Sequence, residues 1–551
     1  MTLVHETDVE GVRTFWVDSG RPTLAATLMF RAGMADERLT TSGWLHLLEH
    51  LALHGLPRGT LAVNGSVGVL STTFSMHGPP DQVVAALAQV TRRLADPDLD
   101  ELERERRVLT AESATRGGPV QRAMGMRYGA QGPGLVSYDD VALGRADAAS
   151  LIELSRSAFA SGNGTLALDG PPPEGLELAL PEGPTWPERG AQVMEQPRTA
   201  YVEPAGLVLS GTVERTPYSA LVPVVVEDAL RRRLRDQDGA AYAPYSLYEP
   251  VDADRAVVLA GSDVSPATHE TLLRTVLELA DTLAADGPEP QSLADITAAM
   301  RQGFTDPYNV GFLSHRAAAQ ALRGRPLEQL DELLAELDAV SPETLVPGLA
   351  TFHDTLMVGA PSGTHEHPAL SMVEQPQVTA LRKGVRSVNW PADASRMHLV
   401  DRVLVVGNDR SAVQYPVDDL AGYLTWEDGA RGLVLADGWS FSIVPAAWSG
   451  GTDYVARLDQ LVPRELHLPQ PRTTAPEPPP RHGLVARWSG GLRRTTSARA
   501  ARALALLLWL LVAAVVVSVM VALAVYYPPG LAPAVVGLLV GLWTSRRKDG
   551  A

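Results

Sequence analysis

The chain has 551 residues, a length that predicts about three or four folding units. It is 45% hydrophobic and 20% charged, which excludes a disordered tail and a fibrous repeat. The formal net charge of −17 argues against a general nucleic-acid binder, because phosphate affinity needs clustered basic charge. The chain contains no cysteine, so any metal site must be built from His, Asp or Glu.

Strand-like and helical segments alternate in the same order twice along the N-terminal two thirds of the chain. The first set comprises predicted strands at 25–30 and 69–75 and predicted helices at 82–94 and 99–114. The second set comprises a strand at 207–213, a helix at 219–235, strands at 245–249 and 256–262, and helices from 269 onward. This repetition predicts two α+β halves, at residues 1–185 and 186–365.

The pattern changes after the second half. Residues 366–468 contain short alternating segments separated by turn residues and end in a short predicted helix, at 454–461. This pattern predicts a small, separate β-rich domain, for which a PH-like barrel is one candidate. Residues 469–502 are rich first in proline and then in arginine, which predicts an extended linker.

The C-terminal region has the composition of a membrane anchor, predicted at 503–545. Ala503–Tyr527 contains 25 residues without a charge, enough for a helix longer than the ~30 Å hydrocarbon core. A second apolar stretch, 531–544, is short, so it either completes a transmembrane hairpin or is re-entrant.

Charges around the predicted anchor indicate its orientation. Six arginines precede the first apolar stretch, Arg546, Arg547 and Lys548 follow the second, and no acidic residue occurs from 478 to 548. The positive-inside rule then predicts that both flanks face the cytoplasm. Arginine far outnumbers lysine, as is typical of GC-rich bacterial genes, which indicates that the membrane is a bacterial inner membrane. Together with the charge pattern, this predicts soluble domains on the cytoplasmic side, attached to the lipid bilayer.

The sequence His46-Leu-Leu-Glu49-His50 is the strongest chemical signal. On a helix His46 and His50 lie one turn apart and can reach the same metal ion, with Glu49 beside it. Two imidazoles and a carboxylate are the usual ligands of a catalytic zinc, and a nearby carboxylate can take a proton from water. This order is the inverted zinc-protease motif. The alternative is an amphipathic helix with structural histidines.

The surrounding residues resemble the M16 (pitrilysin/insulinase) metallopeptidases. An apolar strand ending at Gly33, then Glu37, then Gly43 precede the motif as they do in that family, and the resemblance covers about residues 1–360. It implies two homologous halves in a clam-like chamber, with one zinc ion per chain. It also implies that Glu112 is the third zinc ligand and that Glu105, seven residues earlier on the same helix, supports the site.

The same resemblance implies residues that bind and activate a peptide substrate. Asn64 corresponds to a residue of the family's strand at the lip of the site, although Gly65 departs from the family pattern. The strand at 70–75, with Thr73 and Phe74, resembles the edge strand with which substrate peptides pair as an extra strand. In the second half, Leu234-Arg235-Asp-Gln-Asp-Gly-Ala-Ala-Tyr242 resembles the stretch whose Arg and Tyr stabilise the developing oxyanion.

Three other histidines are weaker candidates. His54 is expected to cap the end of the motif helix, and His365 and His367 lie in a loop-like stretch, where metal binding is the less favoured alternative.

The function these features favour is a membrane-anchored zinc endopeptidase that hydrolyses peptides or unfolded segments in the cytoplasm. A catalytically silent scaffold and a maturation protease for one peptide precursor stay open as alternatives. The sequence does not indicate an oligomeric state.

Overall fold

The computed structural model of the protein describes residues 3–483, except 58, 114–116, 139, 188, 191–193, 195–197, 205, 266–270 and 365, and also residues 486–487. The chain forms two compact units. The first comprises Met1–Pro376, Tyr415–Ile443 and Val455–Pro476, and the second comprises Gln377–Gln414, Val444–Tyr454 and the residues from Glu477 onward.

The first half is built on a six-stranded sheet with the order β1-β2-β6-β3-β5-β4. Its strands are β1 (His5–Val9), β2 (Val12–Trp16), β3 (Leu24–Phe30), β4 (Ala62–Val67), β5 (Thr72–Gly78) and β6 (Gly164–Leu168). Three helices bury apolar side chains against one face of this sheet: α1 (Trp44–Leu53), α2 (Pro80–Ala95) and α5 (Ala148–Ala158). A fourth helix, α3 (Leu102–Ser113), packs on α1 and so brings its acidic side chains next to the histidine motif.

The second half repeats the order of five of these strands in the sheet β12-β7-β11-β8-β10-β9, but its outer strand β12 pairs with β7 in parallel, whereas β1 pairs with β2 antiparallel. Its strands are β7 (Thr199–Val202), β8 (Leu207–Glu214), β9 (Tyr245–Pro250), β10 (Arg255–Ser262), β11 (Met357–Ala360) and β12 (Ser371–Met372). β7 and β11 are parallel, as β2 and β6 are in the first half. The predicted α+β fold with two homologous halves is therefore confirmed.

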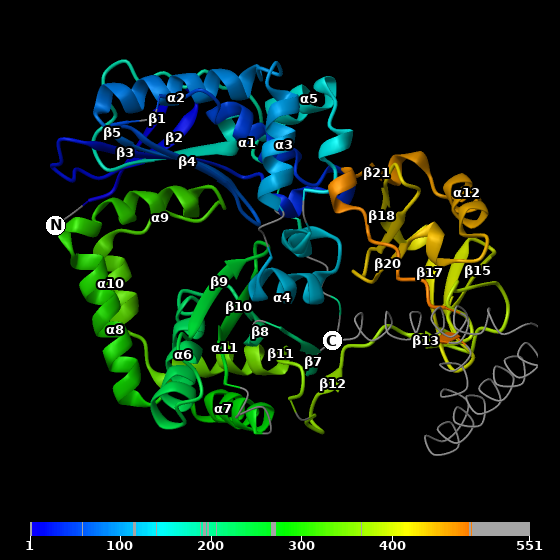
Figure 1. Ribbon diagram of the computed structural model, residues 1–551. Coiled ribbons are helices and arrows are strands. Elements are labelled where there is room, and N and C mark those ends of the chain that lie inside the picture. Colours follow the sequence, from blue (N-terminus) through cyan, green and yellow to red (C-terminus); the bar gives the residue numbers. More distant parts are fainter. Residues whose placement is uncertain are drawn as a thin grey trace, which may run out of the picture. The chain divides into compact units, whose positions relative to one another are not determined.

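Helices cover both sheets (Figure 1). One face of the second sheet packs against α6 (Leu221–Leu230), α7 (Leu272–Asp286) and α11 (Pro342–Asp354), and a π-helical turn (Arg231–Gln237) extends α6. The other helices of the two halves are α4 (Pro119–Tyr128), α8 (Pro290–Thr305), α9 (Gly311–Ala321) and α10 (Leu330–Asp338).

Each half contributes one helix to the sheet of the other half. Helix α9 belongs to the second half, but its buried Leu313 packs with Phe15 and Met29 on the first sheet. Helix α4 belongs to the first half, but its buried Met124 packs with Val257 on the second sheet. Because each sheet has two apolar faces, this exchange covers the face that its own helices leave open.

A buried arginine strengthens the packing of α4. The Arg127 guanidinium, 3% exposed as a residue, donates hydrogen bonds to the carbonyl oxygens of Ser210, at 2.7 Å, and Thr355, at 2.9 Å. Burial lowers the pKa of Arg127 from its ordinary value. These bonds connect α4 to the backbone of the second sheet in the molecular interior.

The C-terminal strands form two further sheets rather than one separate domain at 366–468. Their bounds are β13 (Gln377–Val378), β14 (Val385–Arg386), β15 (Arg396–Val400), β16 (Val403–Gly407), β17 (Ala412–Pro416), β18 (Leu420–Thr425), β19 (Arg431–Leu435), β20 (Ser440–Ile443) and β21 (His467–Pro469), with one helix, α12 (Gly451–Leu461). The sheet β20-β19-β18-β21 lies in the first unit, where Val434 and Leu468 pack with Leu39 and Ala142 of the first half. Alternating apolar residues predicted the strands, but not which core they would join.

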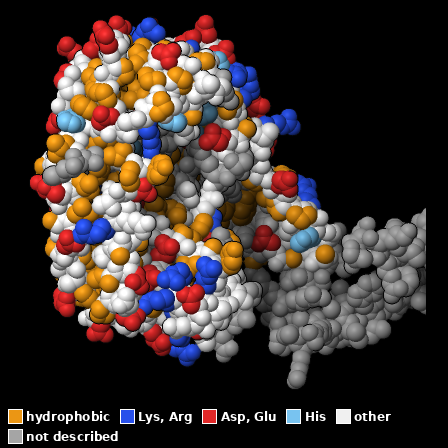
Figure 2. Space-filling view, turned by 90° about the vertical axis from the view of Figure 1, so that its left-hand side faces the viewer, with side chains coloured by type: hydrophobic (Ala, Val, Ile, Leu, Met, Phe, Trp, Pro, Cys, Tyr) orange, Lys and Arg blue, Asp and Glu red, His pale blue; other side chains and the backbone are white. Residues whose placement is uncertain are grey.

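No helix in the described part of the chain is long and apolar enough to cross a membrane. The predicted anchor at 503–545 and the linker beyond residue 487 lie outside the described residues. On the face drawn in Figure 2, acidic and basic side chains are interspersed.

If the exchanged helices support both sheets, shortening a buried side chain of α9 should destabilise the first half. We expect Leu313→Ala to lower the free energy of unfolding by about 2–5 kcal/mol, because it leaves a cavity against the sheet. The neighbouring Phe312 is 44% exposed, so Phe312→Ala should cost about 1 kcal/mol or less although it removes a larger side chain. Urea unfolding of both variants measures the difference; equal losses would contradict this account of α9.

Candidate metal centre

The start of helix α1 is fixed by two residues outside it. Gly43, the N-cap residue, has a φ of 91°, and a Cβ there would come within 2.5 Å of the Asp140 side chain, so glycine is required for both reasons. The Glu37 carboxylate accepts the backbone N–H of Leu45 at 2.9 Å and of Gly43 at 3.1 Å. Together these contacts set where the first turn of α1, which carries His46, begins.

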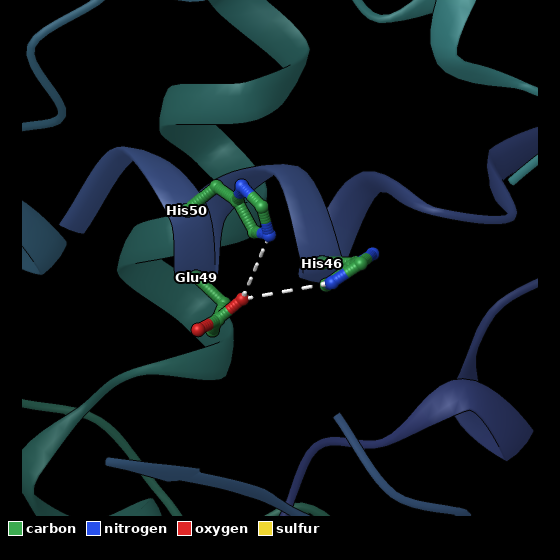
Figure 3. Close-up of side chains that lie close together, drawn as sticks. All are labelled: His46, Glu49 and His50. Atoms are coloured by element: carbon green, nitrogen blue, oxygen red, sulfur yellow. Dashed lines mark ion pairs between the residues drawn. The ribbon is translucent and has the colours of Figure 1, made fainter. Parts of the chain in front are cut away.

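The His46 and His50 imidazoles and the Glu49 carboxylate converge on one point beside α1 (Figure 3), and the Glu112 carboxylate approaches the same two rings. The Glu49 Oε2 atom lies 3.7 Å from Nε2 of His46 and 3.7 Å from Nε2 of His50. Glu112, at the end of α3, places one carboxylate oxygen 3.9 Å from His46 Nε2 and the other 3.5 Å from His50 Nε2. The structure therefore brings Glu112 to the motif although 62 residues separate it from His50.

The opposite side of each ring is bound to another carboxylate. His46 Nδ1 lies 2.9 Å from Asp140 Oδ2, and His50 Nδ1 lies 3.1 Å from Glu105 Oε2. A carboxylate accepts a hydrogen bond from Nδ1–H, so the Nε2 lone pair of each ring is left to face the convergence point. Glu105 also bonds His54 Nδ1, at 3.0 Å, through its other oxygen, and His54 is the C-cap residue of α1.

This donor set fits a small divalent metal ion. Ligand atoms around a tetrahedral zinc lie about 3.3 Å apart, and the distances of 3.5 and 3.9 Å from the two Glu112 oxygens to the Nε2 atoms exceed that spacing by about 0.2 and 0.6 Å. Four carboxylates surround two imidazoles here, and all but Glu112 are buried. Such a concentration of negative charge is costly without a cation. His46 and His50, together with Glu49 or Glu112, are the residues that could hold the ion.

The convergence point opens into a cavity of about 640 Å³. Asn64 and Gly65 of β4 line it opposite the histidines, as does the exposed Val108 of α3. A Cβ at position 65 would come within 1.8 Å of the Glu49 carboxylate. Glycine at position 65, where the sequence departs from the family pattern, therefore leaves room for the Glu49 side chain.

Burial changes the acidity of two carboxyl groups near the centre. Burial raises the pKa of Glu37 to about 8, against the opposing effect of the two N–H groups it accepts. Burial also raises the pKa of Glu249 to about 7; this residue lies on β9 and lines a second cavity that adjoins the histidines.

The prediction of the edge strand was wrong. Residues 70–75 contribute to β5, which is paired on both sides, with β3 and with β4, and the edge of the sheet is β4. Phe74 is fully buried in the core, and the Thr73 hydroxyl bonds Ser66 at 2.8 Å, so neither side chain is placed to contact a peptide added at the edge. The apolar pattern is the same for an inner and an edge strand, because only the sheet order distinguishes them.

Arg235 and Tyr242 lie together but apart from the centre. The Arg235 guanidinium stacks over the Tyr242 ring, 5.6 Å from its centroid, and Tyr242 is 74% exposed. Within the described part of the chain, neither residue contacts the histidines or lines either cavity beside them. Of the loop histidines, His365 lies outside the described residues, and His367 Nδ1 accepts the backbone N–H of Ala369.

Asp140 is the residue that the sequence did not reveal. It follows no motif and stands 94 positions after His46, in a loop after α4. Only the packing of that loop against Gly43 places it next to the ring.

No protein family model and no curated protein sequence matches the chain. Its structure, however, is similar to solved structures of M16 peptidases. A peptidase M16 inactive domain from Pseudomonas fluorescens matches with a TM-score of 0.56 and 16% identity over 66% of this chain and 100% of its own. Pitrilysin matches with a TM-score of 0.51 and 15% identity over 67% of this chain and 46% of its own.

The chain has the fold of the M16 peptidases. The periplasmic protease PqqL from Escherichia coli is also similar, with a TM-score of 0.52 and 12% identity over 78% of this chain and 56% of its own. Structures with the M16 fold thus include named proteases and a domain named inactive. The residues of the site, rather than the M16 fold, must therefore indicate the activity.

The two carboxylates behind the rings should control metal affinity. We expect Asp140→Asn and Glu105→Gln each to weaken binding of a divalent metal ion about tenfold to hundredfold, because the ring loses its orienting acceptor. Glu103→Gln, on the same helix but exposed, is the matched control and should leave affinity unchanged. Competition with a chromophoric chelator measures all three; unchanged affinity in the first two would refute the orienting role.

Proposed function

We propose that this protein is a zinc-dependent peptidase that hydrolyses peptides or unfolded polypeptide segments. One observation carries the proposal: the Nε2 atoms of His46 and His50 converge with Glu49 and Glu112, while carboxylates bind both Nδ1 atoms. A structural role for the histidines would not need two further carboxylates on the open side of the rings.

Each side chain has a distinct role in this proposal. His46, His50 and Glu112 would bind one zinc ion, which when bound polarises a water molecule and the substrate carbonyl. Glu49 is buried at 4% exposure beside both rings, so it is the base that removes a proton from the attacking water. The same carboxyl group then delivers that proton to the leaving amine.

The edge strand β4 supports a peptide substrate. It lines the first cavity through Asn64 and Gly65, and no strand in the described part of the chain pairs with its outer edge. An extended peptide can pair with such an edge through its main chain and lie across the metal centre. This mode of binding needs an unfolded segment and requires little of its sequence. In this proposal β4, rather than Thr73 and Phe74 as first expected, binds the substrate.

The oxyanion role of Arg235 and Tyr242 rests on the family resemblance alone. Their guanidinium and hydroxyl donors suit that task, but it requires both side chains to approach the centre from their present exposed position.

We also propose that the chain is anchored in the inner membrane with its peptidase part in the cytoplasm. The support is the uncharged stretch Ala503–Tyr527 and the arginines on its N-terminal side.

In spheroplasts, an added protease should leave the first half intact, whereas the same treatment of broken cells should degrade it. Degradation in intact spheroplasts would contradict the orientation.

Replacing the proposed base tests the peptidase directly. We expect Glu49→Gln to retain stoichiometric zinc and to lose peptide hydrolysis by about two to four orders of magnitude, because the amide cannot accept the proton. Glu153→Gln, an exposed change on α5, should keep full activity. Metal analysis and turnover of a quenched fluorescent peptide, with and without chelator, provide the readout.

Each outcome of that experiment has a definite meaning. Absence of zinc and of turnover in the unaltered chain would favour the silent scaffold. Zinc binding with cleavage of only one precursor would favour the maturation protease. Full activity in Glu49→Gln would refute the assignment of the base.

A further inference from the structure

A second cavity, of about 630 Å³, adjoins the metal centre. It shares His46, Gly65 and Glu112 with the first cavity and extends from there to β9 of the second half; we call it the β9 cavity. Much of its wall is apolar, with contributions from Val120, Met124, Val136 and Leu247. A side chain close to the scissile bond could therefore enter it.

The charges on its wall all have one sign. Its ionisable side chains, apart from His46 and Tyr138, are Glu112 and Glu249, and no lysine or arginine is among its described lining residues. Glu249 forms no hydrogen bond or ion pair in the described part of the chain, and Arg323 is the one cation that influences its ionisation. Burial makes the Glu249 carboxylate costly and Arg323 offsets this only in part, since the pKa stays raised, so a cationic ligand would lower the cost further.

The position of Glu249 relative to a bound peptide follows from the two sheets. β9 is the edge strand of the second sheet, as β4 is of the first (Figure 1). Residues 65–69, at and after the end of β4, form one side of the β9 cavity, and Leu247 and Glu249 of β9 form another. Since side chains of an extended peptide alternate in direction, a peptide paired with β4 would present every second side chain to one side.

We infer that the β9 cavity is a substrate subsite for a basic side chain, arginine or lysine, and that Glu249 selects it. This inference rests on the proposed peptidase function. The aliphatic part of the side chain packs on Met124 and Leu247, and its cationic end pairs with the Glu249 carboxylate. An acidic side chain is rejected because the Glu249 carboxylate repels it.

The experiment uses the full chain loaded with zinc and a series of fluorogenic peptides. One residue at a time, from three positions before to three after the cleaved bond, is arginine, citrulline or glutamate. Citrulline has nearly the shape of arginine without its charge. We expect kcat/KM to be about tenfold to hundredfold higher for arginine than for citrulline at one position, and lowest for glutamate there.

Variants of Glu249 assign that preference to one residue. Glu249→Gln should reduce the arginine-to-citrulline ratio to about one. Glu249→Arg should reverse the order and favour glutamate, which a merely structural role of Glu249 would not produce. Glu214→Gln removes the same charge from the exposed end of β8 and should leave the ratio as in the unaltered chain.

Failure of the subsite and failure of the peptidase give different results. Hydrolysis with equal rates for arginine and citrulline at every position, or a ratio that survives in Glu249→Gln, would overturn the subsite and leave the peptidase standing. If no peptide is cleaved, the proposed function fails, and binding of the same peptides to zinc-loaded Glu49→Gln then decides the subsite. Equal affinities in fluorescence anisotropy would overturn it as well.

Discussion

The arrangement of the two halves depends on the exchange of helices α4 and α9. Each sheet buries one face under helices of its own half and the other face under a helix of the other half. The hydrogen bonds of Arg127 to the second sheet make the position of α4 specific, since a buried guanidinium without acceptors would be strongly unfavourable. The β9 cavity, which draws its wall from both halves, depends on this exchange.

Electrostatics connects the metal centre to the rest of the first half. Glu105 lies on α3, Asp140 in the loop after α4, and Glu49 on α1 itself, so three separate segments contribute carboxylates around the two rings. Without a cation their mutual repulsion opposes the packing of these segments. A bound divalent ion would therefore stabilise the fold as well as provide chemistry, because it attracts all of these groups.

The two equivalent edge strands have different tasks in this interpretation. β4 offers main-chain groups beside the histidines, which suits binding with little sequence preference. β9 offers a carboxylate at the far side of a mostly apolar cavity, which suits the selection of one side chain. Under the proposed function, the first half would supply the chemistry and the main-chain pairing, and the second half would add the selection of one side chain.

The sequence by itself determined the features that depend on local spacing. His46, Glu49 and His50 share a helix face because of the helical repeat, and Glu105 and Glu112 do so for the same reason. The repeated order of strands and helices was likewise sufficient to predict two α+β halves. Tertiary structure alone decided the proximity of Asp140 to His46, the identity of the edge strand, the exposed position of Arg235 and Tyr242, and the place of Glu249. These relations join segments far apart in the chain, and their distances depend on which apolar faces pack together, which no local pattern encodes.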